Sequence, residues 1–180
     1  MLFITNDAGD SWDEVDLGLA GKPSCLRFLD DGRRGWLIEQ RLTIDDNAIS
    51  SHLYSSTDGG LQWEQVVHFE RDIGDLCVLD AQTLFVAGED GFASRTTDAG
   101  KTWQRLKTGC RGFINSIEFY NKGLGLLLSD FGVLLLTQDG GETWQRIVDR
   151  REVGNLIAAV FLSETQVVLA ANRGIYNLQL

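Results

Sequence analysis

One eight-residue segment recurs four times in this chain without gaps. The copies occupy residues 5–12, 56–63, 96–103 and 137–144. Each reads serine or threonine, any residue, aspartate, alanine or glycine, glycine, any residue, serine or threonine, and tryptophan, with Gln62 as the only departure. Successive aspartates lie 51, 40 and 41 residues apart. A period near 40 residues is that of one four-stranded blade, so the repeat predicts an all-β propeller.

The residues shared by the copies suit a tight hairpin. The aspartate can accept hydrogen bonds from the amides of its own turn, and glycine can take the positive φ that such a turn needs. The tryptophan supplies a large apolar plate for packing. A catalytic residue is usually unique, whereas a turn former recurs. We therefore predict a structural role for Asp7, Gly9, Trp12, Asp58, Gly60, Trp63, Asp98, Gly100, Trp103, Asp139, Gly141 and Trp144.

Short apolar stretches surround each segment in the same order and predict four strands, A to D, per repeat. In the third and fourth repeats these strands are 74–79, 83–88, 92–96 and 103–107, then 114–120, 125–129, 133–137 and 144–148. In the second repeat they are 25–29, 35–40, 49–55 and 63–69. No stretch shows a sustained 3.6-residue apolar period, so we expect essentially no helix.

The two ends of the chain hold incomplete sets of strands. The chain opens with C and D strands at 2–5 and 12–17, and it closes with A, B and C strands at 156–163, 166–171 and 175–180. The closing A and B strands can join the opening C and D strands, which gives about four four-stranded blades and one spare strand. We predict a single propeller domain over residues 1–180. Three states of its ring stay open: closed, completed by a homo-oligomer, or partial.

The repeated segment resembles the Asp-box, also called the bacterial neuraminidase repeat. Residues 88–103 and 132–144 are most similar to the photosystem II stability and assembly factor family. That resemblance implies a seven-bladed, non-enzymatic propeller that binds a protein partner during the assembly of a membrane complex. Sialidases, xyloglucanase-type glycosidases and sortilin-type receptors also contain the box, where it is structural. The box therefore does not reveal chemistry.

Composition narrows the classes of partner. A net charge of −10 disfavours nucleic acid. The three cysteines include no C-x-x-C pair, and the two histidines have no neighbouring ligand in sequence, so we predict no metal and no cofactor. No apolar run approaches the roughly 18 residues of a membrane span. The N-terminus lacks the features of a signal peptide, which predicts a cytoplasmic location as given, or an exported one if a segment precedes it.

Arginines recur in phase with the repeat. Arg71, Arg111 and Arg151 are spaced 40 residues apart, each in the connection from a D strand to the next A strand. These connections gather on one face of a propeller, so the three side chains would form a partial ring there, with Arg150 nearby. The guanidinium fork suits carboxylates and phosphates, which predicts binding of an acidic peptide or another anion. The alternative is structural ion pairs with Glu70, Asp72, Asp149 and Glu152.

The connections from B to C strands are expected on the same face. They include Asp130 and Phe131, and an exposed Phe131 would be an apolar anchor for a protein partner. We therefore predict a non-catalytic, assembly-factor-like module that binds a protein through the D–A and B–C loops. The alternative is a fragment of a glycosidase or sialidase-like enzyme, or a carbohydrate-binding module. A glycosidase needs a carboxylate pair, for which Asp30, Asp31, Asp45, Asp46, Asp90 and Asp130 are available. A sialidase needs a Tyr/Glu pair and three arginines.

Overall fold

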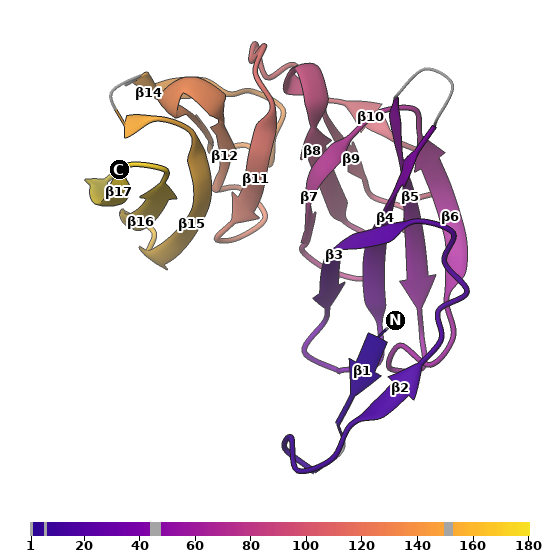
Figure 1. Ribbon diagram of the computed structural model, residues 1–180. Coiled ribbons are helices and arrows are strands. Elements are labelled where there is room, and N and C mark those ends of the chain that lie inside the picture. Colours follow the sequence, from indigo (N-terminus) through magenta and orange to yellow (C-terminus); the bar gives the residue numbers. More distant parts are fainter. Residues whose placement is uncertain (1, 6, 44–47, 150–152) are drawn as a thin grey trace. The chain divides into compact units, whose positions relative to one another are not determined.

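The computed structural model describes residues 2–5, 7–43, 48–149 and 153–180. The chain divides into two compact units, Met1–Glu70 and Arg71–Leu180, which we describe one at a time (Figure 1). All strand pairs are antiparallel, and the helical elements in the described ranges are two single 3-10 turns, Glu89–Gly91 and Asp130–Gly132. The prediction of an all-β chain with essentially no helix is confirmed. The described residues include no helix long and apolar enough to span a bilayer.

The first unit contains a two-stranded hairpin and one four-stranded sheet. The hairpin pairs β1 (Leu2–Ile4) with β2 (Asp13–Val15). The sheet runs in chain order through β3 (Lys22–Phe28), β4 (Gly35–Leu42), β5 (Ile49–Ser56) and β6 (Glu64–Phe69). Strand β4 begins with a continuous apolar run, Gly35 to Ile38, and is buried on both faces as such a run predicts.

The second unit contains two four-stranded sheets and one three-stranded sheet, each in chain order. The first sheet is β7 (Ile73–Val78), β8 (Leu84–Gly88), β9 (Ala93–Thr96) and β10 (Gln104–Arg105). The second is β11 (Ile114–Phe119), β12 (Gly125–Ser129), β13 (Val133–Thr137) and β14 (Gln145–Asp149). The third is β15 (Leu156–Ser163), β16 (Gln166–Ala171) and β17 (Gly174–Gln179).

Two apolar cores join these three sheets. Leu127 of β12 belongs to the core shared with β7–β10, whereas Leu126 and Leu128 belong to the core shared with β15–β17. Side chains alternate across a strand, so the Leu126-Leu127-Leu128 run of β12 supplies both faces of the sheet. The β11–β14 sheet is therefore a layer between two neighbouring sheets, which is the packing of propeller blades.

The count of about four blades is met by three four-stranded sheets and one three-stranded sheet. The closing strand differs from expectation. Instead of remaining spare, β17 pairs with β16 from Ala171↔Gly174 to Gln166↔Gln179 and takes the edge that we had assigned to the strand at 2–5. The two-residue connection explains this pairing, because a tight hairpin closes at a smaller entropic cost than a long-range contact. The single domain over residues 1–180 stays a prediction.

Candidate partner-binding site at the loop end of the second unit

The sheets of the second unit have two distinct ends. Consecutive antiparallel strands reverse direction, so their connections alternate between the ends. One end holds the boxes and the β7–β8 and β11–β12 turns, and we call it the box end. The other holds the β8–β9, β10–β11 and β12–β13 connections, and we call it the loop end. At the box end, Gly140 N–H donates to Gly123 O at 2.9 Å, which ties a box to the first turn of its own sheet.

The box at 137–144 is a closed network of hydrogen bonds. Asp139 accepts bonds from the Thr143 N–H at 2.9 Å, the Thr143 hydroxyl at 2.5 Å and the Thr137 hydroxyl at 2.8 Å. These bonds favour the ionised carboxylate and lower the pKa of Asp139 to about 2, with the Thr143 hydroxyl as the largest cause. The indole Nε1 of Trp144 donates to Gly141 O at 3.1 Å.

The other three boxes repeat this network. The pKa of Asp7 and that of Asp98 are also lowered to about 2 by the side-chain hydroxyls and amides of their own turns. The backbone N–H of Gln62 lowers the pKa of Asp58 in the same way, but the Gln62 side chain has no hydroxyl that could donate a further hydrogen bond. Each box indole donates to its own glycine carbonyl, as in the pairs Trp12–Gly9, Trp63–Gly60 and Trp103–Gly100. The aspartates are thus engaged within their own hairpins. The described ranges contain no cluster of three or more metal-ligating side chains.

Two arginines meet on one aromatic ring at the loop end. The guanidinium carbons of Arg71 and Arg105 lie 4.5 and 4.4 Å from the centroid of the Phe92 ring. Burial lowers the pKa of Arg105, and so does the nearby charge of Arg71. Neither guanidinium forms an ion pair within the described part of the chain. For Arg71, the expected alternative of an ion pair with Glu70 or Asp72 is therefore replaced by a ring contact.

A second group of residues surrounds a hollow of about 270 Å³ at the same end. Its lining comprises Gly109, Cys110, Arg111, Gly112, Asp130, Phe131, Val133 and Arg146. Arg111 is exposed, and Asp130 accepts a hydrogen bond from the Asn115 amide at 3.0 Å. The structure thus brings together three of the residues that we had predicted for partner binding. Their binding role stays a prediction.

Backbone hydrogen bonds connect the two groups. Gly91 N–H donates to Gly112 O at 2.8 Å, and Asp130 N–H donates to Phe113 O at 3.0 Å. The β10–β11 connection that carries Arg111 is therefore held between the β8–β9 and β12–β13 turns. Gly91 precedes Phe92 directly in the chain, so the backbone of the β8–β9 turn links the two groups. The backbone of Cys110 lies very close to Gly91, since a Cβ on Gly91 would be 2.0 Å from Cys110 O.

Phe131 is held in an unfavourable backbone conformation while its ring faces solvent. Its φ is +61° and its ψ is 23°, and the residue is 61% exposed. Left-handed backbone costs a bulky residue about 1–2 kcal/mol, and such strain concentrates at functional sites. The Asn155 side chain supports the turn by accepting the Phe131 N–H at 3.1 Å. The equivalent turn of the preceding sheet places Asp90 in the same conformation, with φ +53°.

Other predicted residues fall outside this description, and two functional candidates were missed. Arg150 and Arg151 lie outside the described residues, as do Asp45, Asp46 and Glu152.

Sequence reasoning overlooked Arg105 and Arg146, which each stand two positions after a box tryptophan and 41 residues apart. The signal was present in the sequence, because arginines recur with the repeat in the D strands as they do in the D–A connections.

A tyrosine–glutamate pair lies in the first unit, where sequence reasoning did not expect one. The Tyr54 hydroxyl donates to Glu39 Oε2 at 2.9 Å, Arg41 donates to the same oxygen at 2.8 Å, and Gly21 N–H donates to Oε1. Burial opposes ionisation of Glu39, but the bonds from Arg41 and Tyr54 outweigh it and lower the pKa. The side chain of Glu39 is fully buried. It therefore belongs to an internal ion pair and cannot reach a substrate.

Asp31, an exposed carboxylate considered for the glycosidase alternative, is also hydrogen-bonded within the protein. The Asp31 carboxylate accepts bonds from the backbone of Arg33 and Arg34 and from the Arg34 side chain. The backbone amide of Arg34 is the largest cause that lowers the pKa of Asp31 to about 2. A glycosidase acid needs a raised pKa instead. Asp31 is thus built as a turn residue.

The sequence matches the family described as "Photosynthesis system II assembly factor YCF48" over residues 4–150 and 58–177. A curated relative, "Photosystem II assembly lipoprotein Ycf48" from Synechococcus sp. (strain CC9902), is 24% identical over 155 residues, which cover 83% of this chain and 44% of the relative. The chain spans about half the length of the curated relatives that it matches. Because that relative is named a lipoprotein, the comparison does not support the cytoplasmic location expected from the sequence.

Two solved structures share the fold. "YCF48 from Cyanidioschyzon merolae" is 17% identical with a TM-score of 0.66, and the match covers 92% of this chain and 56% of that one. A GH74 enzyme from Niastella koreensis is 15% identical with a TM-score of 0.77, and the match covers 98% of this chain and 32% of that one. An assembly factor and an enzyme thus have the same fold, so the fold alone does not decide activity.

Proposed function

The chain belongs to the photosynthesis system II assembly factor YCF48 family, and from this premise we propose that it is a non-catalytic module that binds a protein partner. The proposed binding surface is the loop end of the second unit. The partner is an acidic segment that also carries an apolar residue. The lipoprotein name of the curated relative supports an exported location for this chain, which cell fractionation checks.

The single observation that carries this proposal is the meeting of Arg71 and Arg105 on Phe92. Two like charges close together disfavour each other, and no carboxylate of the described chain offsets them. The ring holds both guanidinium groups by cation–π attraction, worth about 0.5–1 kcal/mol each at an exposed site. A carboxylate from a partner would therefore meet two donors that are already in place.

Phe131 and the hollow beside it supply the apolar part of the surface. An aromatic side chain has few rotamers to lose, and exposed aromatic anchors contribute strongly to protein interfaces. The ring is already exposed, at 61%, and its backbone strain persists without a packing role that explains it. The chain as a whole carries a net charge of −10, so an acidic partner would be repelled by most of the surface and attracted to the arginines of this end.

Anisotropy of a labelled decapeptide with four aspartates and two leucines tests the proposal. The variant Arg71→Gln/Arg105→Gln should weaken binding about tenfold or more, and added salt should weaken wild-type binding. Arg33→Gln is the control, because Arg33 is exposed in the first unit and its side chain makes no hydrogen bond or ion pair within the described residues. If the double variant and the control bind the peptide equally well, the loop end is not the binding surface.

A further inference from the structure

The aromatic ring that holds two arginines at the loop end has a smaller counterpart in the next sheet. Phe92 directly follows the 3-10 turn between β8 and β9. Val133 directly follows the equivalent turn between β12 and β13, 41 residues later. The backbone is extended at both positions, with φ −64° and ψ 128° at Phe92 and φ −87° and ψ 123° at Val133. A valine thus stands where the preceding sheet has an aromatic ring.

The two arginines that contact Phe92 also have counterparts in the next sheet. Arg111 lies 40 residues after Arg71, in the connection that leads into the next sheet. Arg146 lies 41 residues after Arg105, in the last strand of that sheet. Both arginines line the hollow of about 270 Å³, and so does the valine that replaces the ring. The hollow is therefore bordered by the counterparts of the three residues that meet in the preceding sheet.

The rest of the lining leaves room for a ring. Gly109 and Gly112 contribute no side chain to the hollow. A Cβ built at Gly109 would have nothing within 4 Å, and one at Gly112 would lie 3.7 Å from Phe131 Cδ2. The exposed Phe131 ring thus stands at the rim. Because aromatic rings attract each other in offset and edge-to-face arrangements, a ring that enters the hollow gains a further contact there.

The charges of the lining favour an uncharged ring over a carboxylate. Asp130 belongs to the same lining as Arg111 and Arg146, and it accepts the Asn115 amide at 3.0 Å. A carboxylate that entered the hollow would come close to this like charge, which is costly at an interface. A ring carries no net charge and presents a negative π face to the two guanidinium groups.

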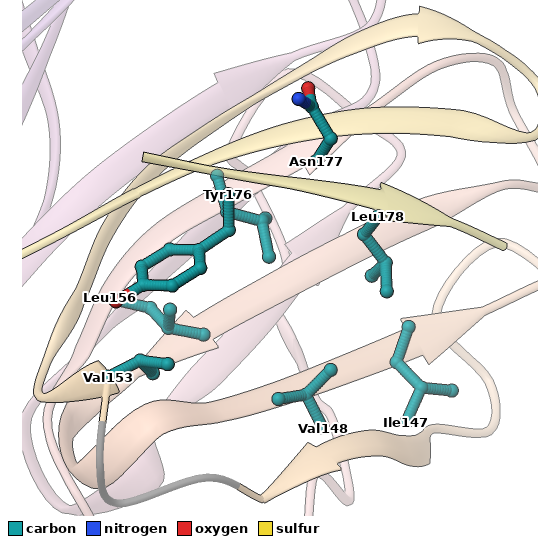
Figure 2. A pocket seen from close by; sticks show the side chains of 8 residues that line it. Ile147, Val148, Val153, Leu156, Tyr176, Asn177 and Leu178 are labelled. Atoms are coloured by element: carbon teal, nitrogen blue, oxygen red, sulfur yellow. The ribbon is translucent and has the colours of Figure 1, made fainter. Parts of the chain in front are cut away.

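A second hollow of the second unit shows that room alone does not make such a site. It has a volume of about 310 Å³ and also borders β14. Figure 2 shows Tyr176 and Leu178 facing Ile147 and Val148 across it. Its lining in the described part of the chain includes no charged side chain. The two arginines set the loop-end hollow apart from it.

We propose that the loop-end hollow binds an aromatic side chain of the partner segment through cation–π contacts with Arg111 and Arg146. The ring of the partner takes the place that Phe92 has in the preceding sheet. This inference rests on the proposed function and makes it more specific, because the apolar residue of the acidic segment becomes an aromatic one. One sheet then recognises the carboxylates of the segment, and the next sheet recognises its ring.

Three versions of the labelled decapeptide test this inference by anisotropy. The first keeps both leucines, the second replaces one by phenylalanine, and the third replaces the same one by cyclohexylalanine, which has a similar shape but no π face. We expect the phenylalanine peptide to bind about fivefold to tenfold more tightly than the cyclohexylalanine peptide. Val133→Phe should reduce this ratio to about one, because the chain's own ring then fills the hollow.

Arg111→Gln provides a second variant that does not depend on repacking. Arg111 is exposed, so its replacement should leave the unfolding midpoint unchanged, whereas Val133 is only 8% exposed. The loss of one cation should reduce the ratio of the two affinities to about threefold or less. Arg33→Gln removes a charge from the first unit and should leave the ratio as it is in the wild type. If Val133→Phe does not fold, the comparison of these two arginine variants decides the outcome.

A neutral probe, N-acetylphenylalanine amide, separates this inference from the proposed function. In an NMR titration of the isotope-labelled protein, its ring should shift the Nε–H signals of Arg111 and Arg146 upfield, whereas its cyclohexylalanine analogue should not. If the acidic peptides do not bind but the probe gives these shifts, the proposed acidic partner is wrong and the aromatic site stands. If the leucine peptide binds but phenylalanine gains nothing over cyclohexylalanine, or if the probe moves neither signal, the inference is overturned.

Discussion

The box end and the loop end of the second unit are built from the same repeat, but they differ in what they keep constant. At the box end, Asp98 and Asp139 accept the same set of hydrogen bonds from the same turn positions. At the loop end, the equivalent left-handed position holds Asp90 in one sheet and Phe131 in the next. Repetition at one end fixes the blade, which leaves the loops of the other end free to vary.

The largest effect on the free energy of unfolding should come from the close contact between Gly91 and Cys110 at the loop end. Gly91→Ala should lower the free energy of unfolding by about 3 kcal/mol or more, because positive φ costs about 1–2 kcal/mol and a forced contact adds about 1–3 kcal/mol. Gly109→Ala is the matched control, with a similar φ of +67° but nothing within 4 Å of its Cβ, and should lose only about 1–2 kcal/mol. Urea unfolding measures both, and equal losses would show that the contact with Cys110 relaxes.

An intermediate effect of opposite sign should come from Phe131. Asparagine tolerates left-handed backbone, so Phe131→Asn should raise the free energy of unfolding by about 0.5–1 kcal/mol and weaken binding of the acidic peptide. Asp90→Phe places the same ring in the equivalent turn and should lower stability by a similar amount. Thermal unfolding compares the two variants. If Phe131→Asn destabilises the chain instead, the ring has a structural role and is not kept for a partner.

The smallest effect concerns the pKa of the aspartates in the boxes. The folded pKa of Asp139, about 2, is below its ordinary value of 3.8, so its bonds stabilise the fold above pH 3.8 and lose this effect as pH falls toward 2. Thr143→Val removes the hydroxyl donor and should raise the pKa of Asp139. Gln62→Thr adds one and should lower the pKa of Asp58 further. Carboxyl NMR titration measures both, and unchanged values would mean that the hydroxyl at this position of the box does not set the pKa of the aspartate.

Most of the fold followed from the sequence, because its signals are local. Strands β12, β13, β15 and β16 have the predicted bounds. The D strand expected at 103–107 is reduced to Gln104–Arg105. The Leu106 N–H still donates to Ala93 O of β9 at 2.9 Å, and the Leu106 side chain lies in the core. The end of an edge strand thus depends on packing as well as on the strand ladder.

The candidate site was predicted in part. The repeat phase of Arg71 and Arg111 and the turn position of Phe131 were enough to place all three at one end, because antiparallel strands fix where their connections lie. The contact of Arg71 and Arg105 with Phe92 was not predictable, because it joins residues 13 to 34 positions apart along the chain. Tyr54 and Glu39, 15 residues apart, meet across neighbouring strands for the same reason.

The sequence by itself determined the blades: the box hydrogen bonds span at most four residues, and strand alternation needs only two. Only the tertiary structure decided which repeated residues became different from their counterparts. It buried Leu106 but left Ile147 beside a cavity, it packed Trp144 but exposed Trp12, and it turned the Phe131 ring outward. The physical reason is that the burial of a residue depends on the neighbouring sheet, and the sequence of the residue's own repeat does not specify which residues pack against it.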